Sequence, residues 1–227
     1  MKKIVVLSGA GMSAESGIGT FRDAGGLWEK YIIDDVATPD GFRRNPALVL
    51  DFYNQRRKQL VESKPNEGHL ILAELENKYD IHIITQNVDN LHEQAGSTKV
   101  LHLHGELMKV RSTSASADVF ELSNNNYEIN LGDKCPKGYQ LRPHIVWFGE
   151  EVPEIENAVD IVKTADILVV IGTSMQVYPA ASLINYVKTT STVYLIDPLD
   201  IEHLPTHVHV IKNIASKGLK EFVKMID

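Results

Sequence analysis

Residues 3–14 read KIVVLSGAGMSA, and this stretch decides the fold. A short, mostly apolar run, Lys3–Ser8, leads directly into the pattern G-x-G-x-x-A, with its fixed positions at Gly9, Gly11 and Ala14. This is the order of a strand followed by a phosphate-binding turn. The glycines would let backbone N–H groups approach a pyrophosphate, and the helix expected next would offer its positive end. We therefore expect a nucleotide to bind after the first strand.

Short β-branched runs bounded by Gly, Asp or Asn recur along the chain and predict further strands. They are Ile81–Thr85, Val100–Leu103, Ile145–Phe148, Ile167–Ile171, Val193–Ile196 and His207–Ile211. Helical periodicity lies between them, at Pro46–Glu62, Glu67–Asn77, Glu154–Thr164, Pro179–Lys188 and Ser216–Met225. The strands are almost continuously apolar, as in a parallel sheet that helices cover on both faces. The sequence thus predicts an α/β fold with a Rossmann-like, mostly parallel sheet.

Two segments interrupt this alternation and predict a smaller, inserted lobe. Residues 29–78 have a helical pattern, and residues 107–143 contain runs of loop composition. We assign these two segments to the small lobe and residues 1–28, 79–106 and 144–227 to the Rossmann-like domain. A ligand site is expected between the two parts.

Composition narrows the range of functions. The 227 residues carry a formal net charge of -7, which disfavours a protein that binds the phosphate backbone of nucleic acids. Cys135 is the one cysteine, which excludes a disulfide within the chain and a metal site built from several thiolates. No run approaches the 18 or so apolar residues of a membrane span, so we expect a cytoplasmic protein without a membrane partner.

Polar residues follow the predicted strands at the edge where open α/β sheets bind ligands. They are Gln86, Asn87, Asp89, His104, Gly172, Thr173, Ser174 and Asp197. Asp89 or Ser174 taken alone is typical of a loop or a helix cap. Four polar strand ends on one side of a sheet favour a binding site instead.

Two histidines, His102 and His104, alternate near the end of the third predicted strand. Because alternate side chains of a strand point to opposite faces, we expect only one of them to face the cleft, and no metal site from the pair. His104 lies nearer the strand end and is the better candidate for a general base, because histidine titrates near neutral pH.

The motifs together form a series that spans nearly the whole chain. They are GAGMSAESGI at 9–18 with Phe21-Arg22, TQNVD at 85–89, His104-Gly105, VWFGE at 146–150 and GTS at 172–174. This series resembles that of the sirtuin family of NAD-dependent protein lysine deacylases. The resemblance implies that NAD is consumed: the acyl-lysine carbonyl oxygen attacks C1′ of the nicotinamide ribose, nicotinamide leaves, and a histidine then deprotonates a ribose hydroxyl. Free lysine, nicotinamide and O-acyl-ADP-ribose would be the products.

The resemblance also implies a role for each matching residue. His104 would be the catalytic base, with Asn87 and Asp89 beside the nicotinamide and its ribose. The NAD-binding residues would be Gly9, Ala10, Gly11, Ser13, Phe21, Arg22, Trp28, Gln86, Asn87, Asp89, Gly172, Thr173, Ser174, Asp197 and Ala215. The peptide would pair as an added strand along Val146, Phe148 and Gly149. Acyl-lysine proteins or peptides are then the expected partners of a monomeric enzyme, with no direct nucleic-acid partner.

The small lobe departs from the family pattern at its metal site. Most sirtuins carry a zinc ribbon with two Cys-x-x-Cys pairs, whereas this chain has Ser112 and Ser114 in the first region and only Cys135 in the second. Hydroxyls do not replace thiolates in a structural zinc site, so no zinc is expected. The lobe is expected to be held by packing, or to be mobile without substrate.

A second departure concerns the helix predicted at Pro46–Glu62. Arg56 interrupts an apolar stripe that includes Tyr53, and a cation there needs a partner. By helix statistics alone it would reach solvent or pair with Asp51 or Glu62. We expect the neighbouring Arg57 and Lys58 to lie on a solvated face.

In the family context, Tyr53 and Arg56 resemble the tyrosine–arginine pair of the sirtuins that remove succinyl, malonyl and glutaryl groups. There the guanidinium holds the acyl carboxylate by two hydrogen bonds and the phenol adds a third. We therefore expect a desuccinylase or demalonylase that also deacetylates.

Two other functions fit parts of the pattern. An NAD glycohydrolase or a protein ADP-ribosyltransferase would also begin by breaking the bond between nicotinamide and ribose. A non-catalytic NAD-sensing module would need no base at the reacting ribose, and the presence of His104, Asn87 and Asp89 argues against it.

Overall fold

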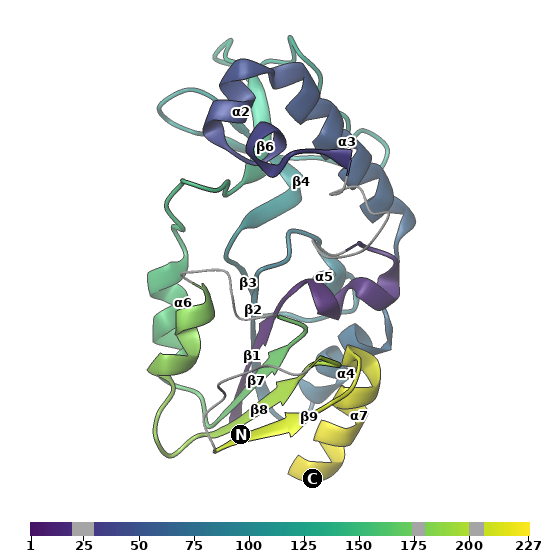
Figure 1. Cartoon of the computed structure of the whole chain (residues 1–227), viewed down its shortest axis with the longest axis vertical. Coiled ribbons are helices and arrows are strands. Elements are labelled where there is room, and N and C mark those ends of the chain that lie inside the picture. Colours follow the sequence, from purple (N-terminus) through teal and green to yellow (C-terminus); the bar gives the residue numbers. More distant parts are fainter. Residues whose placement is uncertain (20–29, 174–179, 200–206) are drawn as a thin grey trace.

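A six-stranded parallel sheet forms the larger part of the molecule (Figure 1). Its spatial order is β3-β2-β1-β7-β8-β9. The strands are β1 Lys3–Ser8, β2 Asp80–Thr85, β3 Val100–His102, β7 Ile167–Ile171, β8 Thr192–Ile196 and β9 Val208–Ile211. Since β1 stands between β2 and β7, the loops that follow these three strands meet at one edge of the sheet. The predicted α/β class with a mostly parallel sheet is confirmed.

The computed structural model describes residues 1–19, 30–173, 180–199 and 207–227. Four predicted site residues, Phe21, Arg22, Trp28 and Ser174, lie outside the described residues.

Helices cover both faces of the parallel sheet, as its continuous apolar strands require. On one face α4 (Glu67–Leu75) and α7 (Ala215–Ile226) pack against Ile4 and Val6 of the central strand. On the other face α6 (Ile155–Val162) and the 3₁₀ helix η4 (Ala180–Tyr186) pack against Val5 and Leu7. The helix predicted at Pro179–Lys188 is thus a 3₁₀ helix over its described residues.

A second, antiparallel sheet of three strands forms the core of the small lobe, in the order β5-β4-β6. Its strands are β4 Gly105–Ser112, β5 Val119–Glu121 and β6 Leu141–Ile145, and its helices are α1 Ile33–Val36, α2 Pro39–Arg44 and α3 Pro46–Glu62. Leu50 of α3 packs in one buried cluster with Val110 and Ile129. Apolar packing therefore joins the helical part of the lobe to its sheet. Helix α4 falls within the predicted segment 29–78 but packs on the parallel sheet.

The strand predicted at Ile145–Phe148 is wrong, because β6 ends where that strand was expected to begin. Beyond Ile145 the backbone groups find other partners: the Trp147 N–H donates to the Glu150 carboxylate, and the Phe148 N–H donates to the Ala37 carbonyl. Pro143 argues against a strand at this point of the sequence. An edge strand such as β6 nevertheless tolerates proline.

The segment after β1 also differs from the expectation of a helix. Two short 3₁₀ helices, η1 (Ala10–Met12) and η2 (Ala14–Ser16), follow the strand in its place. The positive helix end predicted to face a pyrophosphate is therefore absent from this position.

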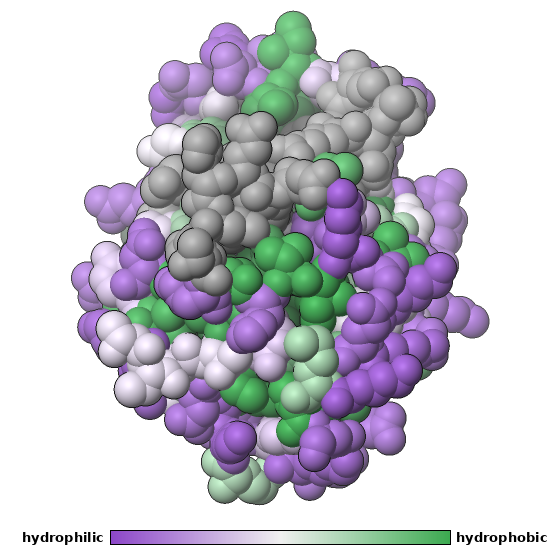
Figure 2. All heavy atoms as spheres, turned by 60° about the horizontal axis from the view of Figure 1, so that its bottom comes forward, coloured by the Kyte–Doolittle hydropathy of each residue, from purple (hydrophilic) through white to green (hydrophobic). Residues whose placement is uncertain are grey.

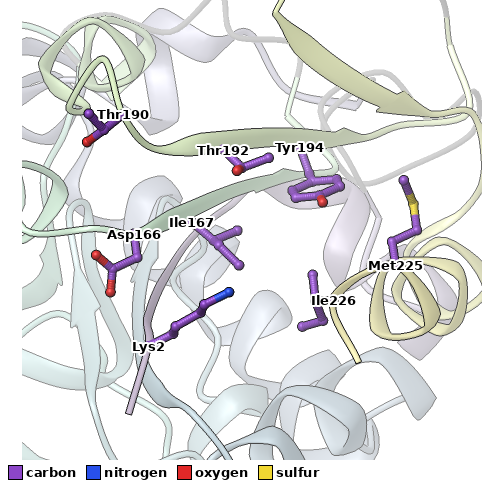
Figure 3. Close-up of a pocket in the computed structure, with 8 residues that line it drawn as sticks. All are labelled: Lys2, Asp166, Ile167, Thr190, Thr192, Tyr194, Met225 and Ile226. Carbon is purple, nitrogen blue, oxygen red and sulfur yellow. The ribbon is translucent and has the colours of Figure 1, made fainter.

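A hollow of about 490 Å³ lies at the opposite end of the parallel sheet, near the amino ends of its strands (Figure 3). Lys2, Asp166, Thr192 and Met225 contribute to its lining. Figure 2, which turns this end of the molecule toward the reader, shows hydrophobic residues broken up by hydrophilic ones. Because open parallel sheets bind ligands at their carboxyl ends, the functional site is expected at the other end of the sheet.

Each helix in the described part of the chain is too short or too polar to cross a lipid bilayer.

Candidate active site

The turn after β2 brings three predicted residues together. The Asn87 side-chain amide donates to the Gly9 carbonyl at 3.0 Å and to Ser13 Oγ at 3.1 Å. Ser13 Oγ in turn donates to Asp89 Oδ2 at 2.9 Å. Asp89 is buried, and this burial raises the pKa of its carboxyl group. Buried amide, hydroxyl and carboxyl groups at this edge suit a polar ligand such as a ribose.

His104 follows the third strand and is fixed by the same turn. Its Nδ1 atom lies 3.1 Å from the carbonyl oxygen of Gln86, which can only accept a hydrogen bond. Nδ1 therefore carries the proton of the neutral ring, and Nε2 keeps its lone pair. Burial lowers the pKa of His104, with the Gln86 carbonyl opposing this effect. The ring is thus prepared to accept a proton at Nε2 near neutral pH.

The strand that carries His102 ends before His104. Strand β3 ends at His102, and His104 lies in the turn after it. The Nδ1 atom of His102 lies 3.1 Å from the Asn87 carbonyl, so the two histidines contact consecutive carbonyls of one turn. His102 contacts Glu93 with its other ring nitrogen, so the expectation that only one of the two histidines faces the cleft stays a prediction.

The glycine-rich turn packs tightly on the end of β7. The Gly9 N–H donates to the Ile171 carbonyl at 2.9 Å, and the Gly11 N–H donates to the Gly172 carbonyl at 2.8 Å. Gly172 has a φ of 57°, and a Cβ added there would lie 2.5 Å from the Met12 backbone nitrogen. The glycines therefore allow backbone segments to approach one another, and the N–H groups of Gly9 and Gly11 bind protein carbonyls where a pyrophosphate was expected.

Three further residues of the predicted NAD site, Gln86, Thr173 and Asp197, follow neighbouring strands, whereas Ala10 begins η1. Gln86 donates to Thr173 Oγ1 at 3.1 Å, which links the ends of β2 and β7. Asp197 follows β8 and accepts a hydrogen bond from the Leu199 N–H at 2.9 Å. Ala215, the first residue of α7, belongs to the buried core. The Ala215 side chain therefore packs among other apolar core residues.

Tyr53 and Arg56 lie side by side on α3. The Arg56 guanidinium carbon is 5.8 Å from the centre of the Tyr53 ring. Burial lowers the pKa of Arg56. The negative charge of Asp89, in the turn after β2, opposes this effect. The two side chains therefore lie together on one face of α3.

Trp147 orients the Tyr53 hydroxyl. Its indole Nε1–H donates to the Tyr53 oxygen at 2.9 Å. Burial raises the pKa of Tyr53, so the phenol stays protonated at neutral pH. With its oxygen occupied by the indole, the Tyr53 hydroxyl can direct its own proton to another acceptor.

Two charged residues hold Trp147 in place, a role that the sequence predicted for neither of them. The Arg142 guanidinium stacks on the indole, 3.4 Å from the ring centre, and pairs with Glu150 at 2.8 Å. Glu150 also accepts the Trp147 backbone N–H at 2.8 Å. The stacking of a guanidinium on an indole adds cation–π attraction to this contact.

Arg57 is a correction to the sequence analysis, because it is fully buried. Its Nε–H donates to the Leu107 carbonyl at 2.8 Å, and its Nη1 donates to Asn54 at 2.7 Å. The residue therefore ties α3 to β4, whereas Lys58 is exposed as expected. Helical periodicity predicted a solvated position for Arg57, because it lies off the apolar stripe that contains Arg56.

The predicted peptide-binding segment lies between the two sheets. The Val146 N–H donates to the His104 carbonyl at 2.9 Å, so this segment touches the candidate base. Trp147 is buried, whereas Phe148 is 49% exposed and Gly149 turns the chain with a φ of 88°. Alternate burial persists here although the segment is not a strand.

A buried polar chain behind the turn was also missed. His92 Nε2 lies 3.0 Å from Ser8 Oγ, and Ser8 donates to Thr85 Oγ1, which accepts the Asn87 N–H at 3.0 Å. Burial lowers the pKa of His92 well below its ordinary value and so keeps the ring neutral. The only sequence signal is that Ser8 and Thr85 end their strands.

Cys135 lies in the small lobe, with its Sγ 3.3 Å from Ser112 Oγ. Ser112 donates to Ser114 Oγ at 2.8 Å. One thiol among hydroxyls does not make the thiolate set that a structural zinc ion needs. Within the described ranges, no three His, Cys, Asp or Glu side chains group together as metal ligands.

Known proteins resemble this chain over its whole length. The pattern that describes the Sir2 family matches residues 9–179. Over 230 residues the chain is 57% identical to an NAD-dependent protein deacylase of Bacteroides thetaiotaomicron, covering 100% of this chain and 98% of the relative. It is 53% identical over 229 residues to an NAD-dependent protein deacylase of Helicobacter pylori, covering 100% and 97% of the two chains.

Solved structures show the same architecture. A crystal structure described as a complex of a Sir2 homologue with NAD has a TM-score of 0.89 at 40% identity, covering 99% of this chain and 89% of that one. A mutant Sir2 homologue in complex with ADP-ribose has a TM-score of 0.90 at 40% identity, covering 99% and 92%.

Proposed function

The chain belongs to the Sir2 family and is an NAD-dependent protein deacylase, and from this premise we propose that it prefers lysines carrying succinyl or malonyl groups, while also removing acetyl groups. The observation that supports the preference is the pair formed by Arg56 and Tyr53, with the Tyr53 oxygen fixed by Trp147. A guanidinium beside a protonated phenol offers three donors to a carboxylate. An acetyl group has no carboxylate to accept these hydrogen bonds.

The proposed NAD site lies at the carboxyl ends of β1, β2 and β7. The donor set fits a dinucleotide, because Ser13, Asn87 and Asp89 present buried hydroxyl, amide and carboxyl groups beside one another. NAD supplies a ribose carbon that becomes electrophilic when nicotinamide leaves. Asn87 and Asp89 would hold the nicotinamide end, and His104 Nε2 would take a proton from a ribose hydroxyl.

The proposed peptide site runs along Val146, Phe148 and Gly149. Phe148 is exposed beside the turn at Gly149 and offers an apolar surface, and Val146 of the same segment donates its N–H to the His104 carbonyl. A solved Sir2 structure with 28% identity and a TM-score of 0.81 is described with a deacetylated p53 peptide and 3′-O-acetyl-ADP-ribose. We propose that this chain likewise binds acyl-lysine within a peptide.

Matched succinyl-lysine and acetyl-lysine peptides incubated with NAD test the preference directly. Mass spectrometry would follow the acyl-ADP-ribose product, with the His104→Ala variant as the blank. Faster loss of succinyl would support the proposal. Faster loss of acetyl would return Arg56 to a structural role, and NAD cleavage that ignores both peptides would indicate a glycohydrolase or an ADP-ribosyltransferase.

Replacing Trp147 by phenylalanine should weaken succinyl recognition selectively. Phenylalanine keeps a ring beneath Arg142 but removes the N–H that orients Tyr53. Loss of one neutral hydrogen bond, at about 1 kcal/mol, should raise the KM for the succinyl peptide about 5-fold. The acetyl peptide is the internal control, since it has no carboxylate for Tyr53 to bind. An equal change for both peptides would show that Trp147 acts only on the fold of the lobe.

We also propose that the small lobe folds without zinc. Leu50, Val110 and Ile129 supply an apolar core, and the Lys137–Asp118 ion pair at 2.7 Å closes the loop around Cys135. Dialysis against a zinc chelator should therefore leave both the Tm and the deacylation rate unchanged. Elemental analysis that finds one zinc per chain, or unfolding on chelation, would contradict the proposal.

A further inference from the structure

His102 uses both of its ring nitrogens, although the proposed chemistry does not involve it. Its Nε2 lies 2.8 Å from Glu93 Oε1 on α5 (Leu91–Gln94), and its Nδ1 lies 3.1 Å from the Asn87 carbonyl oxygen. The His102 side chain is only 7% exposed. A nearly buried ring therefore bridges a short helix and the turn that carries Asn87 and Asp89.

Both partners of the ring accept hydrogen bonds. A backbone carbonyl has no proton to give, and an ionised carboxylate has none either. Burial alone would raise the pKa of Glu93, but its hydrogen bond and charge interaction with His102 outweigh this and lower it. A neutral imidazole has one N–H and would turn a lone pair toward one of these acceptors. Only the doubly protonated ring satisfies both.

We propose that His102 is a positioning residue that works as an imidazolium clamp, tying the Asn87 carbonyl to Glu93 and so holding the turn that binds the nicotinamide end of NAD. This inference rests on the proposed role of Asn87 and Asp89 in NAD binding.

The clamp completes the fixation of Asn87. Its N–H donates to Thr85, and its side-chain amide donates to Gly9 and Ser13. These bonds fix the nitrogen atoms of the residue, whereas His102 binds its carbonyl oxygen. Loss of the clamp would free the peptide plane between Asn87 and the next residue, and with it the direction of the turn toward Asp89.

The charged groups around His102 favour the protonated ring. Glu93 on α5 and Glu106 on β4 stabilise the cation, and Glu106 is itself paired with Lys109 at 2.9 Å. His102 also interacts with the carboxylate of Asp89 and with the neutral ring of His92. Burial would lower the pKa of His102, but the bond and charge of Glu93 outweigh it, so the pKa is raised.

The clamp should open at alkaline pH. Its contribution is complete below the ordinary histidine pKa of about 6.5 and is lost as the pH rises through the raised pKa of the folded protein. Because a carboxylate is the stronger acceptor, the last proton should remain at Nε2 beside Glu93. The bond to Asn87 is then the one that is lost.

Nitrogen NMR of the histidine-labelled protein tests the protonation state directly. The resonances missing from a His102→Asn variant identify the residue. We expect both nitrogens of His102 to be protonated at neutral pH, to titrate above about 6.5, and to titrate at lower pH in Glu93→Gln. A neutral His102 ring at pH 7 would overturn the inference, and this readout does not depend on activity.

Kinetics test the positioning role. His102→Asn should raise the KM for NAD and weaken inhibition by free nicotinamide by about 5- to 10-fold each, with a smaller change in kcat. In the native enzyme, opening of the clamp should raise the KM for NAD at alkaline pH. This rise should be absent from His102→Asn. His82→Asn is the matched control, because His82 pairs with Asp80 on β2 far from the turn and should leave the NAD KM unchanged. An unchanged NAD KM in His102→Asn would contradict the proposal.

A double variant separates a clamp from two independent effects. If His102 acts through Glu93, then adding Glu93→Gln to His102→Asn should cause little further change. Additive effects would overturn the clamp. The NAD KM is measured with whichever acyl peptide reacts faster, so failure of the succinyl preference would leave these results interpretable.

Discussion

Replacing Arg56 by methionine should reduce desuccinylation far more than deacetylation. The guanidinium contact with an acyl carboxylate is charge-assisted, and its loss should cost about 2–3 kcal/mol. That is roughly a 30- to 150-fold fall in kcat/KM for the succinyl peptide. The acetyl peptide should lose much less, because methionine keeps the apolar stem that packs near Phe52 and Tyr53. Both values of kcat/KM would be measured on the same peptide sequence.

Lys58→Met is the matched control for this experiment. It removes one positive charge from the same helix at an exposed position, so a general loss of charge would appear in both variants. Arg57 is unsuitable, because its buried bonds to Leu107 and Asn54 hold the lobe together. Equal losses for the two acyl groups in Arg56→Met would show that Arg56 has only a structural role.

The contrast between Arg56 and Arg57 shows what the sequence can and cannot predict on a helix. Periodicity placed Tyr53 on the inward face of α3, and the structure agrees. It could not predict that Arg57 would also be buried, because one of the two acceptors that make this tolerable comes from outside the helix. The carbonyl of Leu107 is 50 residues away in sequence, so no local pattern contains it.

The same reason separates predictable from unpredictable parts of the site. The ends of β1, β2 and β7 were predictable, because parallel strands bring their following loops to one edge. The hydrogen-bond partners of the polar groups in these loops were not predictable. The Gly11 N–H was expected to approach a phosphate, yet it donates to the carbonyl of Gly172, a contact made only once β1 and β7 pair.

Strand prediction failed where tertiary contacts override local preference. The run at Ile145–Phe148 has the β-branched and aromatic residues of a strand, but Glu150 and Ala37 take its backbone N–H groups. In contrast, β4 carries charged residues such as Lys109 and Arg111, and no strand was predicted there. Its backbone hydrogen bonds come from pairing with β5 and β6, which lie further along the chain.

Replacing His104 by alanine should lower kcat by about 10²- to 10⁴-fold, the usual contribution of a general base. The Gln86 carbonyl holds the proton of the neutral ring on Nδ1, so only Nε2 can act as the base. The pH profile of the native enzyme carries a second expectation. Because burial lowers the pKa of His104, activity should persist below pH 6.5 or so and fall only as the pH drops through that lowered pKa.

The step at which His104 acts distinguishes a base from a binding residue. A base that takes its proton after nicotinamide has left should matter little for exchange of labelled nicotinamide into NAD. Exchange in His104→Ala should therefore fall much less than formation of acyl-ADP-ribose. His82→Ala serves as the control, because burial also lowers the pKa of His82 but its ring pairs with Asp80 on β2. Parallel loss of exchange and product formation would mean that His104 chiefly holds NAD in place, since a histidine needed only for proton transfer leaves the first bond cleavage intact.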